Sequence, residues 1–275
     1  MKKIIVLTGA TSGLGELLLK KLSQEDHTIF IPVRNIKKAK IMIEACHPHK
    51  AEIIPVKADL SEQDEISEAI KEILEKTDVI DVLINNAGVF KMKRERNSQG
   101  IEIQFMVNYL AARQFSYGLL PALQKAENGR IINVASKMHT GGNFIYSDLQ
   151  MEKKYSAQNA YSITKLYLVT HTFYLAEKLK NSTVTANVMH PGVYATGITG
   201  ELPAPLNFLW HLFLPSANEG ADILYNMSFN ENLKSVTGQY FDKAYPTEAK
   251  KSSYVKENQQ ILEDYAEKMT GISLI

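Results

Sequence analysis

Residues 4–15 read Ile-Ile-Val-Leu-Thr-Gly-Ala-Thr-Ser-Gly-Leu-Gly, a short apolar run followed directly by a glycine-rich turn. The run Ile4–Leu7 is typical of a buried strand, and Gly13–Leu22 after the turn has the pattern of a helix. Glycines at such a turn let the backbone bend sharply and approach a pyrophosphate, which the positive N-terminal end of the helix attracts. The spacing G-x-x-x-G-x-G, placed after the first strand, therefore favours a dinucleotide site over a simple tight connection.

The alternation of strand and helix continues along the chain and indicates the fold class. Strands are predicted at Ile4–Leu7, Thr28–Val33, Glu52–Val56, Val79–Ile84, Arg130–Val134 and Thr183–Met189. Helices are predicted at Gly13–Leu22, Ile36–Ala45, Ser61–Glu75, Gly100–Leu123 and Ala160–Leu179, with Ser61 as the N-cap of the third. Such alternation indicates right-handed crossovers and a parallel sheet covered on both faces. We therefore predict an α/β fold: a single doubly wound Rossmann-type domain over residues 1–275, closed by a C-terminal helix and strand.

Composition and charge exclude several classes of protein. With 31 Lys and Arg residues against 30 Asp and Glu residues, the net charge of +1 gives no reason to expect nucleic acid or an anionic membrane as a partner. No apolar run approaches the ~20 residues of a membrane span, and Ile4–Leu7 is too short for a signal peptide. The single cysteine, Cys46, favours a reducing compartment, so we expect a cytoplasmic protein. The segment Cys46-His47-Pro48-His49 has no second ligand cluster to pair with, and we expect no metal site.

Several short motifs follow the glycine-rich turn in a fixed order. They are Asp59-Leu60 after the third strand, Asn85-Asn86-Ala87-Gly88 at the end of the fourth, Asn108 in the long helix, Ser136 after the fifth strand, Tyr161-Ser162-Ile163-Thr164-Lys165, and Pro191-Gly192-Val193 with Thr196. Together with the turn, this set resembles the short-chain dehydrogenase/reductase family over nearly the whole chain. Three further features are similar to the retinol-dehydrogenase-like branch of this family. They are the long stretch between Ser136 and Tyr161, in which residues 139–159 are additional, the motif Asn108-Tyr109-Leu110-Ala111, and residues 237–241.

The residue types of this set also have a chemical logic of their own. Tyr161 and Lys165 are four residues apart, so they share one face of a helix. A phenol with a pKa of about 10 is a poor base at neutral pH, and a neighbouring ammonium is expected to lower that pKa. Ser136, arriving from a strand end, is placed to donate a hydrogen bond to a substrate oxygen. The resemblance further implies that Asn108 positions a water that relays protons to Lys165.

The residues after the second predicted strand indicate which dinucleotide binds. NAD-binding versions of this fold carry an acid about 20 residues past the glycine turn, and this sequence has Arg34-Asn35 there. A guanidinium pairs with a 2′-phosphate through two parallel hydrogen bonds. Lys37 and Lys38 add positive charge at a helix start, which is unfavourable unless an anion lies nearby. We predict NADP(H) as the preferred cofactor and NAD(H) as the alternative; the competing interpretation is that Arg34 stacks on the adenine.

The predicted site combines these arguments with the resemblance, which implies that Asp59 contacts the adenine and Lys165 the nicotinamide ribose. The predicted catalytic residues are Asn108, Ser136, Tyr161 and Lys165. The predicted cofactor-binding residues are Thr8, Gly9, Thr11, Ser12, Gly13, Leu14, Gly15, Arg34, Asp59, Leu60, Asn86, Ala87, Gly88, Tyr161, Lys165, Pro191, Gly192, Val193 and Thr196.

These residues predict an oxidoreductase that transfers a hydride between a nicotinamide cofactor and a small-molecule alcohol or carbonyl. An apolar, proline-bearing insertion at about 197–215 is predicted on the substrate side; its residues 202–213 form either a lid, which favours a hydrophobic substrate, or ordinary core. The alternative function is a non-catalytic dinucleotide-binding sensor or scaffold. A sugar-nucleotide epimerase ranks last, since little chain remains for a substrate domain. The resemblance also allows a homo-oligomer through the two long helices.

Overall fold

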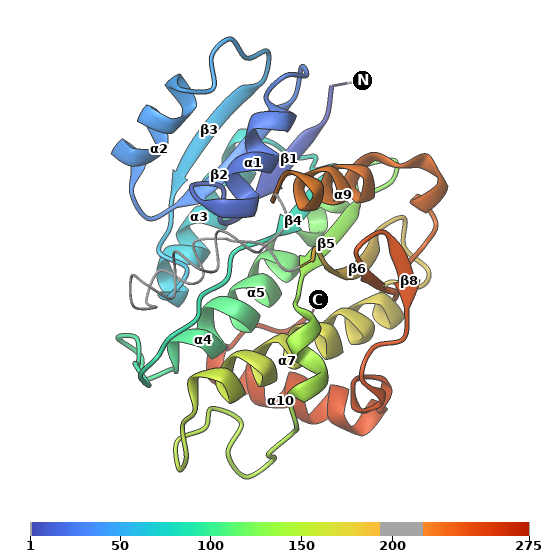
Figure 1. Cartoon of the computed structure of the whole chain (residues 1–275). Coiled ribbons are helices and arrows are strands. Elements are labelled where there is room, and N and C mark those ends of the chain that lie inside the picture. Colours follow the sequence, from blue (N-terminus) through green and yellow to red (C-terminus); the bar gives the residue numbers. More distant parts are fainter. Residues whose placement is uncertain (1, 193–216, 275) are drawn as a thin grey trace.

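The computed structural model describes residues 2–192 and 217–274, and its centre is an eight-stranded sheet (Figure 1). The strands are β1 Ile4–Leu7, β2 Thr28–Val33, β3 Glu52–Lys57, β4 Val82–Asn85, β5 Arg130–Val134, β6 Thr185–His190, β7 Tyr240–Asp242 and β8 Tyr245–Thr247. Their order is β3-β2-β1-β4-β5-β6-β7-β8, and every neighbouring pair is parallel except β7 and β8. The predicted doubly wound sheet is confirmed; the antiparallel edge strand β8 was not predicted.

Helices connect the strands much as the sequence pattern predicts. They are α1 Gly13–Leu22, α2 Ile36–Glu44, α3 Gln63–Lys76, α4 Ile103–Phe105, α5 Ala111–Gly118, α6 Leu120–Leu123, α7 Ala157–Lys178, α9 Ala217–Phe229 and α10 Lys256–Thr270, with 3-10 turns η2 Lys137–Gly141, η4 Glu231–Leu233 and η5 Lys251–Tyr254. The predicted helix Gly100–Leu123 is instead interrupted by a π-helical turn, η1 Met106–Leu110. The predicted N-cap was wrong, because Ser61 donates its hydroxyl to Asp59 Oδ1 (2.7 Å) and α3 begins two residues later.

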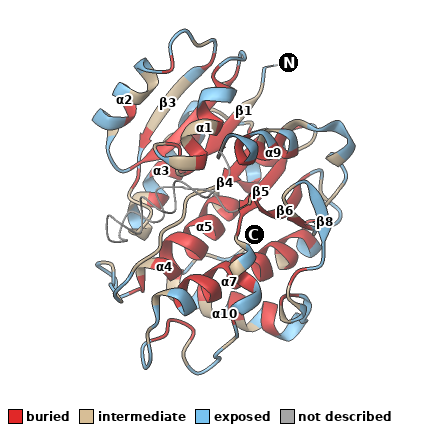
Figure 2. Cartoon of the chain, in the orientation of Figure 1, coloured by how far each residue is buried: buried red, intermediate tan, exposed pale blue. Residues whose placement is uncertain are grey.

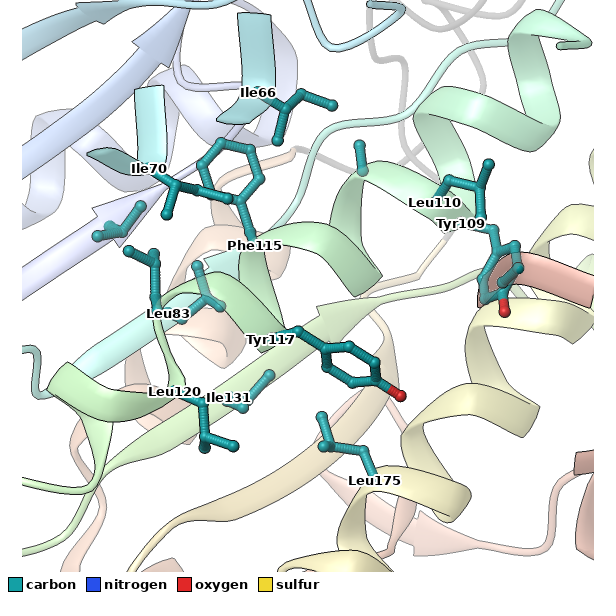
Figure 3. Packing of buried hydrophobic residues seen from close by; sticks show 14 of the residues in the cluster. Ile66, Ile70, Leu83, Tyr109, Leu110, Phe115, Tyr117, Leu120, Ile131 and Leu175 are labelled. Atoms are coloured by element: carbon teal, nitrogen blue, oxygen red, sulfur yellow. The ribbon is translucent and has the colours of Figure 1, made fainter. Parts of the chain in front are cut away.

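Two apolar layers cover the two faces of the sheet. On one face, Leu18 of α1 and Leu224 of α9 pack over buried residues of β1 and β4. On the other face, α3, α5 and α7 form the larger layer, where Figure 3 shows Ile70 and Phe115 meeting above Leu83. Each fully buried side chain of this size stabilises the fold by about 1.5–3 kcal/mol. The strands are therefore apolar on both faces, as parallel strands under helices require.

Helix α7 is enclosed on almost every side, which Figure 2 shows as a nearly continuous buried segment. One side lies on the sheet, and α10 packs against another (Figure 1). Such enclosure removes the amphipathic periodicity expected of a surface helix. It also buries polar side chains of α7, among them Lys165 and His171, so each of them requires a partner inside the protein.

A buried ionic cluster fastens α10 to α5 and α7. Glu263 of α10 accepts hydrogen bonds from Arg113 Nε (2.8 Å) and Tyr117 Oη (2.7 Å). Its other carboxylate oxygen lies 2.6 Å from His171 Nδ1. The Arg113 guanidinium also donates to Ile272 O (2.9 Å), so the chain beyond α10 is held as well. Burial alone would raise the pKa of Glu263, but His171 and Arg113 together hold that pKa at about 2.

We predict that Glu263→Gln lowers the free energy of unfolding by ~3 kcal/mol, because the Arg113 guanidinium then stays buried without a carboxylate. Urea titration measures the change, and Glu267→Gln on the exposed side of the same helix is the control, expected within about 0.5 kcal/mol of the parent. The pKa of Glu263 is depressed in the folded state, so its contribution is complete above the unfolded value of about 4.3 and is lost as the pH falls toward 2. Equal acid sensitivity of parent and variant would contradict this account.

Candidate active site

The carboxyl ends of β1 and β4 lie side by side and together shape the glycine-rich turn. The Thr8 hydroxyl accepts hydrogen bonds from the backbone N–H groups of Asn86 and Ala87, both at 3.1 Å. In return, Asn86 Nδ2 donates to Thr8 O (3.0 Å) and Gly9 O (3.3 Å). The sheet order places β1 next to β4, which is the point in a doubly wound sheet where ligands bind.

Glycine is required at two positions of this turn by close backbone approach. Gly9 has a φ of +69°, and a Cβ there would lie 2.8 Å from Ala87 Cα. A Cβ on Gly15 would lie 2.2 Å from Gly9 O. The N-cap of α1, Ser12, makes no side-chain capping hydrogen bond. The first-turn amides of α1 therefore stay available for an anionic ligand such as a pyrophosphate, and this donor set fits a dinucleotide.

Arg34 and Asp59 meet beyond the ends of β2 and β3. Arg34 Nη1 lies 3.8 Å from Asp59 Oδ2, and the Arg34 side chain is 80% exposed. An ion pair of this length and exposure contributes at most about 1 kcal/mol, so the guanidinium is free to turn toward another anion. The α2 helix behind it is capped by Asn35, whose Oδ1 accepts from Lys38 N at 3.0 Å, and its first turn carries no acid.

Ser136, Tyr161 and Lys165 come together at the carboxyl end of β5. Ser136 follows β5 after Ala135 and lies close enough to the Tyr161 phenol to lower its pKa. Lys165 Nζ, one helical turn further along α7, donates to Val134 O at 2.8 Å and lies 5.7 Å from the centre of the Tyr161 ring. The three predicted catalytic side chains therefore share one place, contributed by β5 and α7.

The pKa values at this place follow from burial. Burial raises the pKa of Tyr161 to about 12, against a smaller lowering by the hydrogen bond from Ser136. Burial lowers the pKa of Lys165 to about 8. The expected lowering of the Tyr161 pKa by the Lys165 ammonium is absent from this geometry, because Nζ is turned to Val134 O and the phenol is desolvated. Phe90, with its ring centre 5.7 Å from that of Tyr161, adds to the apolar surroundings.

Asn108 lies in the π-helical turn η1, beside the other predicted catalytic groups. Its Oδ1 accepts from Val89 N (2.7 Å), while its Nδ2 donates to Val89 O (3.0 Å) and Thr164 Oγ1 (3.1 Å). A Cβ on Gly88 would lie 3.3 Å from Lys165 Nζ and 3.4 Å from Asn108 Oδ1, so these residues meet closely. π-helical turns occur often at functional sites. The sequence predicts Asn108 as a site residue but not its hydrogen-bond partners Val89 and Thr164, which carry no distinctive local signal.

Some of the remaining predicted site residues lie within the described residues, and the others lie outside them. Leu14 is buried and Leu60 packs against the larger apolar layer, whereas Thr11 lies in the turn itself and Gly13 is the first residue of α1, with a φ of +53°. Pro191 is buried after β6, and Gly192 has a φ of +113°. Val193, Thr196, the predicted insertion at 197–215 and its lid-or-core segment 202–213 lie outside the described residues. Within residues 2–192 and 217–274, no cluster of three metal-ligating side chains occurs, and Cys46 is a free, buried thiol.

Comparison with known proteins identifies the family of the chain. The profile of the short chain dehydrogenase family matches residues 3–207. Retinol dehydrogenase 12 of Mus musculus is 31% identical over 244 residues, which cover 87% of this chain and 77% of that protein. Retinol dehydrogenase 14 of Mus musculus is 28% identical over 288 residues, covering 98% of this chain and 86% of that protein.

Solved structures extend the likeness to the fold. A short chain dehydrogenase from Burkholderia cenocepacia in complex with NADP has a TM-score of 0.70 at 21% identity, covering 88% of this chain and 96% of that one. A protein from Mycobacterium paratuberculosis has a TM-score of 0.80 at 22% identity, covering 99% and 95%. The chain belongs to the short chain dehydrogenase family, an oxidoreductase family, and its relatives include retinol dehydrogenases. None of the helices that the structure describes has the length and apolar character of a membrane span.

Proposed function

We propose that this chain is an NADP(H)-preferring oxidoreductase that moves a hydride between the nicotinamide and an alcohol/carbonyl substrate, within a single domain of residues 1–275. The observation that carries the proposal is the meeting of Ser136, Tyr161 and Lys165 beside the turn formed by β1 and β4. A protein that only binds a dinucleotide has no need of a fully buried lysine next to a buried phenol, since both desolvated groups cost stability. This argues for catalysis over the sensor or scaffold function.

The protein's own part in the reaction is to hold the substrate oxygen and to move a proton. When bound, the nicotinamide supplies or accepts the hydride at the substrate carbon. In the reducing direction, Ser136 Oγ donates a hydrogen bond to the carbonyl oxygen, and Tyr161 Oη transfers a proton to the same atom. To stabilise the phenolate that remains, Lys165 Nζ would turn from Val134 O toward Tyr161, whose ring centre lies 5.7 Å away, and Asn108 holds Val89 and Thr164 in place.

The two pKa values indicate which protonation states are present at neutral pH. With a pKa of about 12, the Tyr161 phenol stays protonated at neutral pH and is ready to act as a proton donor. With a pKa of about 8, Lys165 keeps most of its charge at pH 7 and loses it above pH 8. Near neutral pH the site therefore holds the protonated phenol that carbonyl reduction requires. Alcohol oxidation requires the phenolate, so it is expected to increase at higher pH.

The proposal also includes the class of substrate, the cellular location and the oligomeric state. A hydrophobic substrate is supported by the apolar sequence of residues 202–213 and by the names of the retinol dehydrogenase relatives. A cytoplasmic location is supported by the free thiol of Cys46. A homo-oligomer through the two long helices stays a prediction, and α10 packs against α7, one of these helices.

We predict that Tyr161→Phe reduces turnover at least ~100-fold while cofactor affinity changes little, because the variant removes only the proton donor. The assay follows cofactor absorbance with a panel of hydrophobic carbonyl compounds and alcohols. Tyr167→Phe is the matched control, since Tyr167 is a buried tyrosine on the same helix whose hydroxyl donates to Leu149 O (3.3 Å) away from the site. Near-parent turnover in Tyr161→Phe would overturn the mechanism.

We predict that the specificity constant for NADPH exceeds that for NADH at least ~10-fold, which requires only about 1.4 kcal/mol from contacts to the 2′-phosphate. Exposed Arg34, with Lys37 and Lys38 behind it, supplies those contacts, and Arg34→Asp is expected to reverse or abolish the preference. Arg96→Asp makes the same charge change in a different exposed loop and is expected to leave the ratio unchanged. Equal constants in the parent would show that Arg34 does not recognise the phosphate.

A further inference from the structure

A buried histidine outside the predicted site lies directly behind Ser136. His139 belongs to the 3-10 turn η2 and is 1% exposed. Its Nδ1 lies 2.8 Å from Ser136 O, and its Nε2 lies 3.3 Å from the backbone nitrogen of Lys250. The backbone N–H of Lys250 can only donate, so Nε2 is the acceptor. The ring proton of the neutral imidazole therefore sits on Nδ1 and points to the Ser136 carbonyl.

The surroundings of His139 keep it neutral. Burial lowers the pKa of its imidazole, with smaller opposite effects from the Ser136 carbonyl and Asp242 and a further lowering from Lys250. The ring packs against Tyr240 of β7, with ring centres 4.7 Å apart. Asp242 is itself paired with Lys137 at 2.9 Å. A protonated imidazole would set an Nε2–H donor against the Lys250 N–H donor, so only the neutral form satisfies both contacts.

Lys250 extends the contact to the whole turn. Its Nζ donates to Thr140 O (3.0 Å), to Gly142 O and to Asn143 Oδ1 (2.9 Å). A Cβ on Gly142 would lie 2.6 Å from Ser162 O, so the end of the turn lies directly on α7, one residue from Tyr161. The turn is therefore fixed at both ends: it starts at Ser136, and it ends at Gly142, which packs against Ser162, the neighbour of Tyr161.

We infer that His139 is a positioning residue: through the contact of its Nδ1–H with Ser136 O, it fixes Ser136 beside Tyr161. The inference rests on the proposed function, because Ser136 has to meet both the substrate oxygen and Tyr161. Ser136 Oγ also accepts from Met138 N (3.2 Å), so the serine side chain and the turn move together. A shift of about 1 Å at a reacting group costs up to ~100-fold in rate.

Two substitutions separate the two nitrogen contacts. In His139→Asn, the side-chain amide takes the place of Nδ1 and keeps a donor to Ser136 O. In His139→Gln, the longer amide takes the place of Nε2 and keeps only the acceptor for Lys250 N. His139→Phe keeps the ring against Tyr240 and removes both contacts. We expect kcat within ~3-fold of the parent for His139→Asn and at least ~10-fold lower for the Gln and Phe variants, with the cofactor KM unchanged in all three.

A pH profile and a control histidine distinguish positioning from stability. The Ser136 hydrogen bond lowers the Tyr161 pKa, so a displaced Ser136 raises the apparent pKa of the oxidation rate in the Gln and Phe variants. His27 is another buried histidine, whose Nδ1 accepts from Lys3 N (3.2 Å) far from the site, and His27→Phe is expected to lower thermal stability without moving kcat or the profile. Equal losses of kcat in all three His139 variants, in step with their melting temperatures, would overturn the inference.

The tautomer is also measurable without any activity, by long-range ¹H–¹⁵N NMR of the histidine side chains, with His139→Asn identifying the resonance. We expect Nδ1–H at pH 7, and an Nε2–H tautomer or an imidazolium would overturn the inference. Ser136→Ala and Tyr161→Phe, measured in the turnover assay, distinguish the proposed function from the proposed positioning role of His139. If Ser136→Ala and Tyr161→Phe both keep the turnover of the parent, the proposed function is wrong. If both are inactive while all three His139 variants keep the turnover of the parent, only the positioning role is wrong.

Discussion

The site depends on the burial of one charged group, the ammonium of Lys165. This residue belongs to α7, a helix that is enclosed on almost every side. Burial lowers the pKa of Lys165 to about 8, which leaves most of its charge at neutral pH, and its Nζ donates to Val134 O with Gly88 and Asn108 beside it. Removing a cation from water costs several kcal/mol, and the cost falls on the stability of the whole fold. The sheet supplies one wall of this enclosure, and the C-terminal part of the chain supplies another.

The C-terminal segment is therefore part of the site although it contributes no reacting group. Glu263 fastens α10 to Arg113 and His171, and this brings the last helix against α7. Just before α10, Lys250 holds the turn between Ser136 and Gly142. These residues lie beyond residues 3–207 of the family match, so the final quarter of the chain holds groups on α5 and α7 and in the η2 turn after Ser136.

Local features of the fold were predictable from sequence, and non-local ones were not. The limits of β1, β2, β5 and α1 follow directly from β-branched runs and from the glycine turn, and the structure confirms them. The three-residue strands of the β7–β8 hairpin are too short to show a period, and the ionic cluster at Glu263 joins residues 92 to 150 positions apart in the chain, which no periodicity reveals. The same limit explains why the effect of Lys165 on Tyr161 was misjudged: spacing on a helix gives proximity, whereas burial and the direction of Nζ decide the pKa.

The central claim is that this site transfers a hydride from a nicotinamide to a substrate carbon while the protein supplies the proton. The most direct measurement is isotope tracing with NADPH deuterated at the transferable C4 position, using a hydrophobic aldehyde and mass spectrometry of the alcohol formed. The account predicts one deuterium on the carbinol carbon when the cofactor is labelled, and none on that carbon when unlabelled NADPH is used in D₂O. An alcohol that takes its carbon-bound hydrogen from solvent, or no alcohol formed from any carbonyl compound, would contradict it.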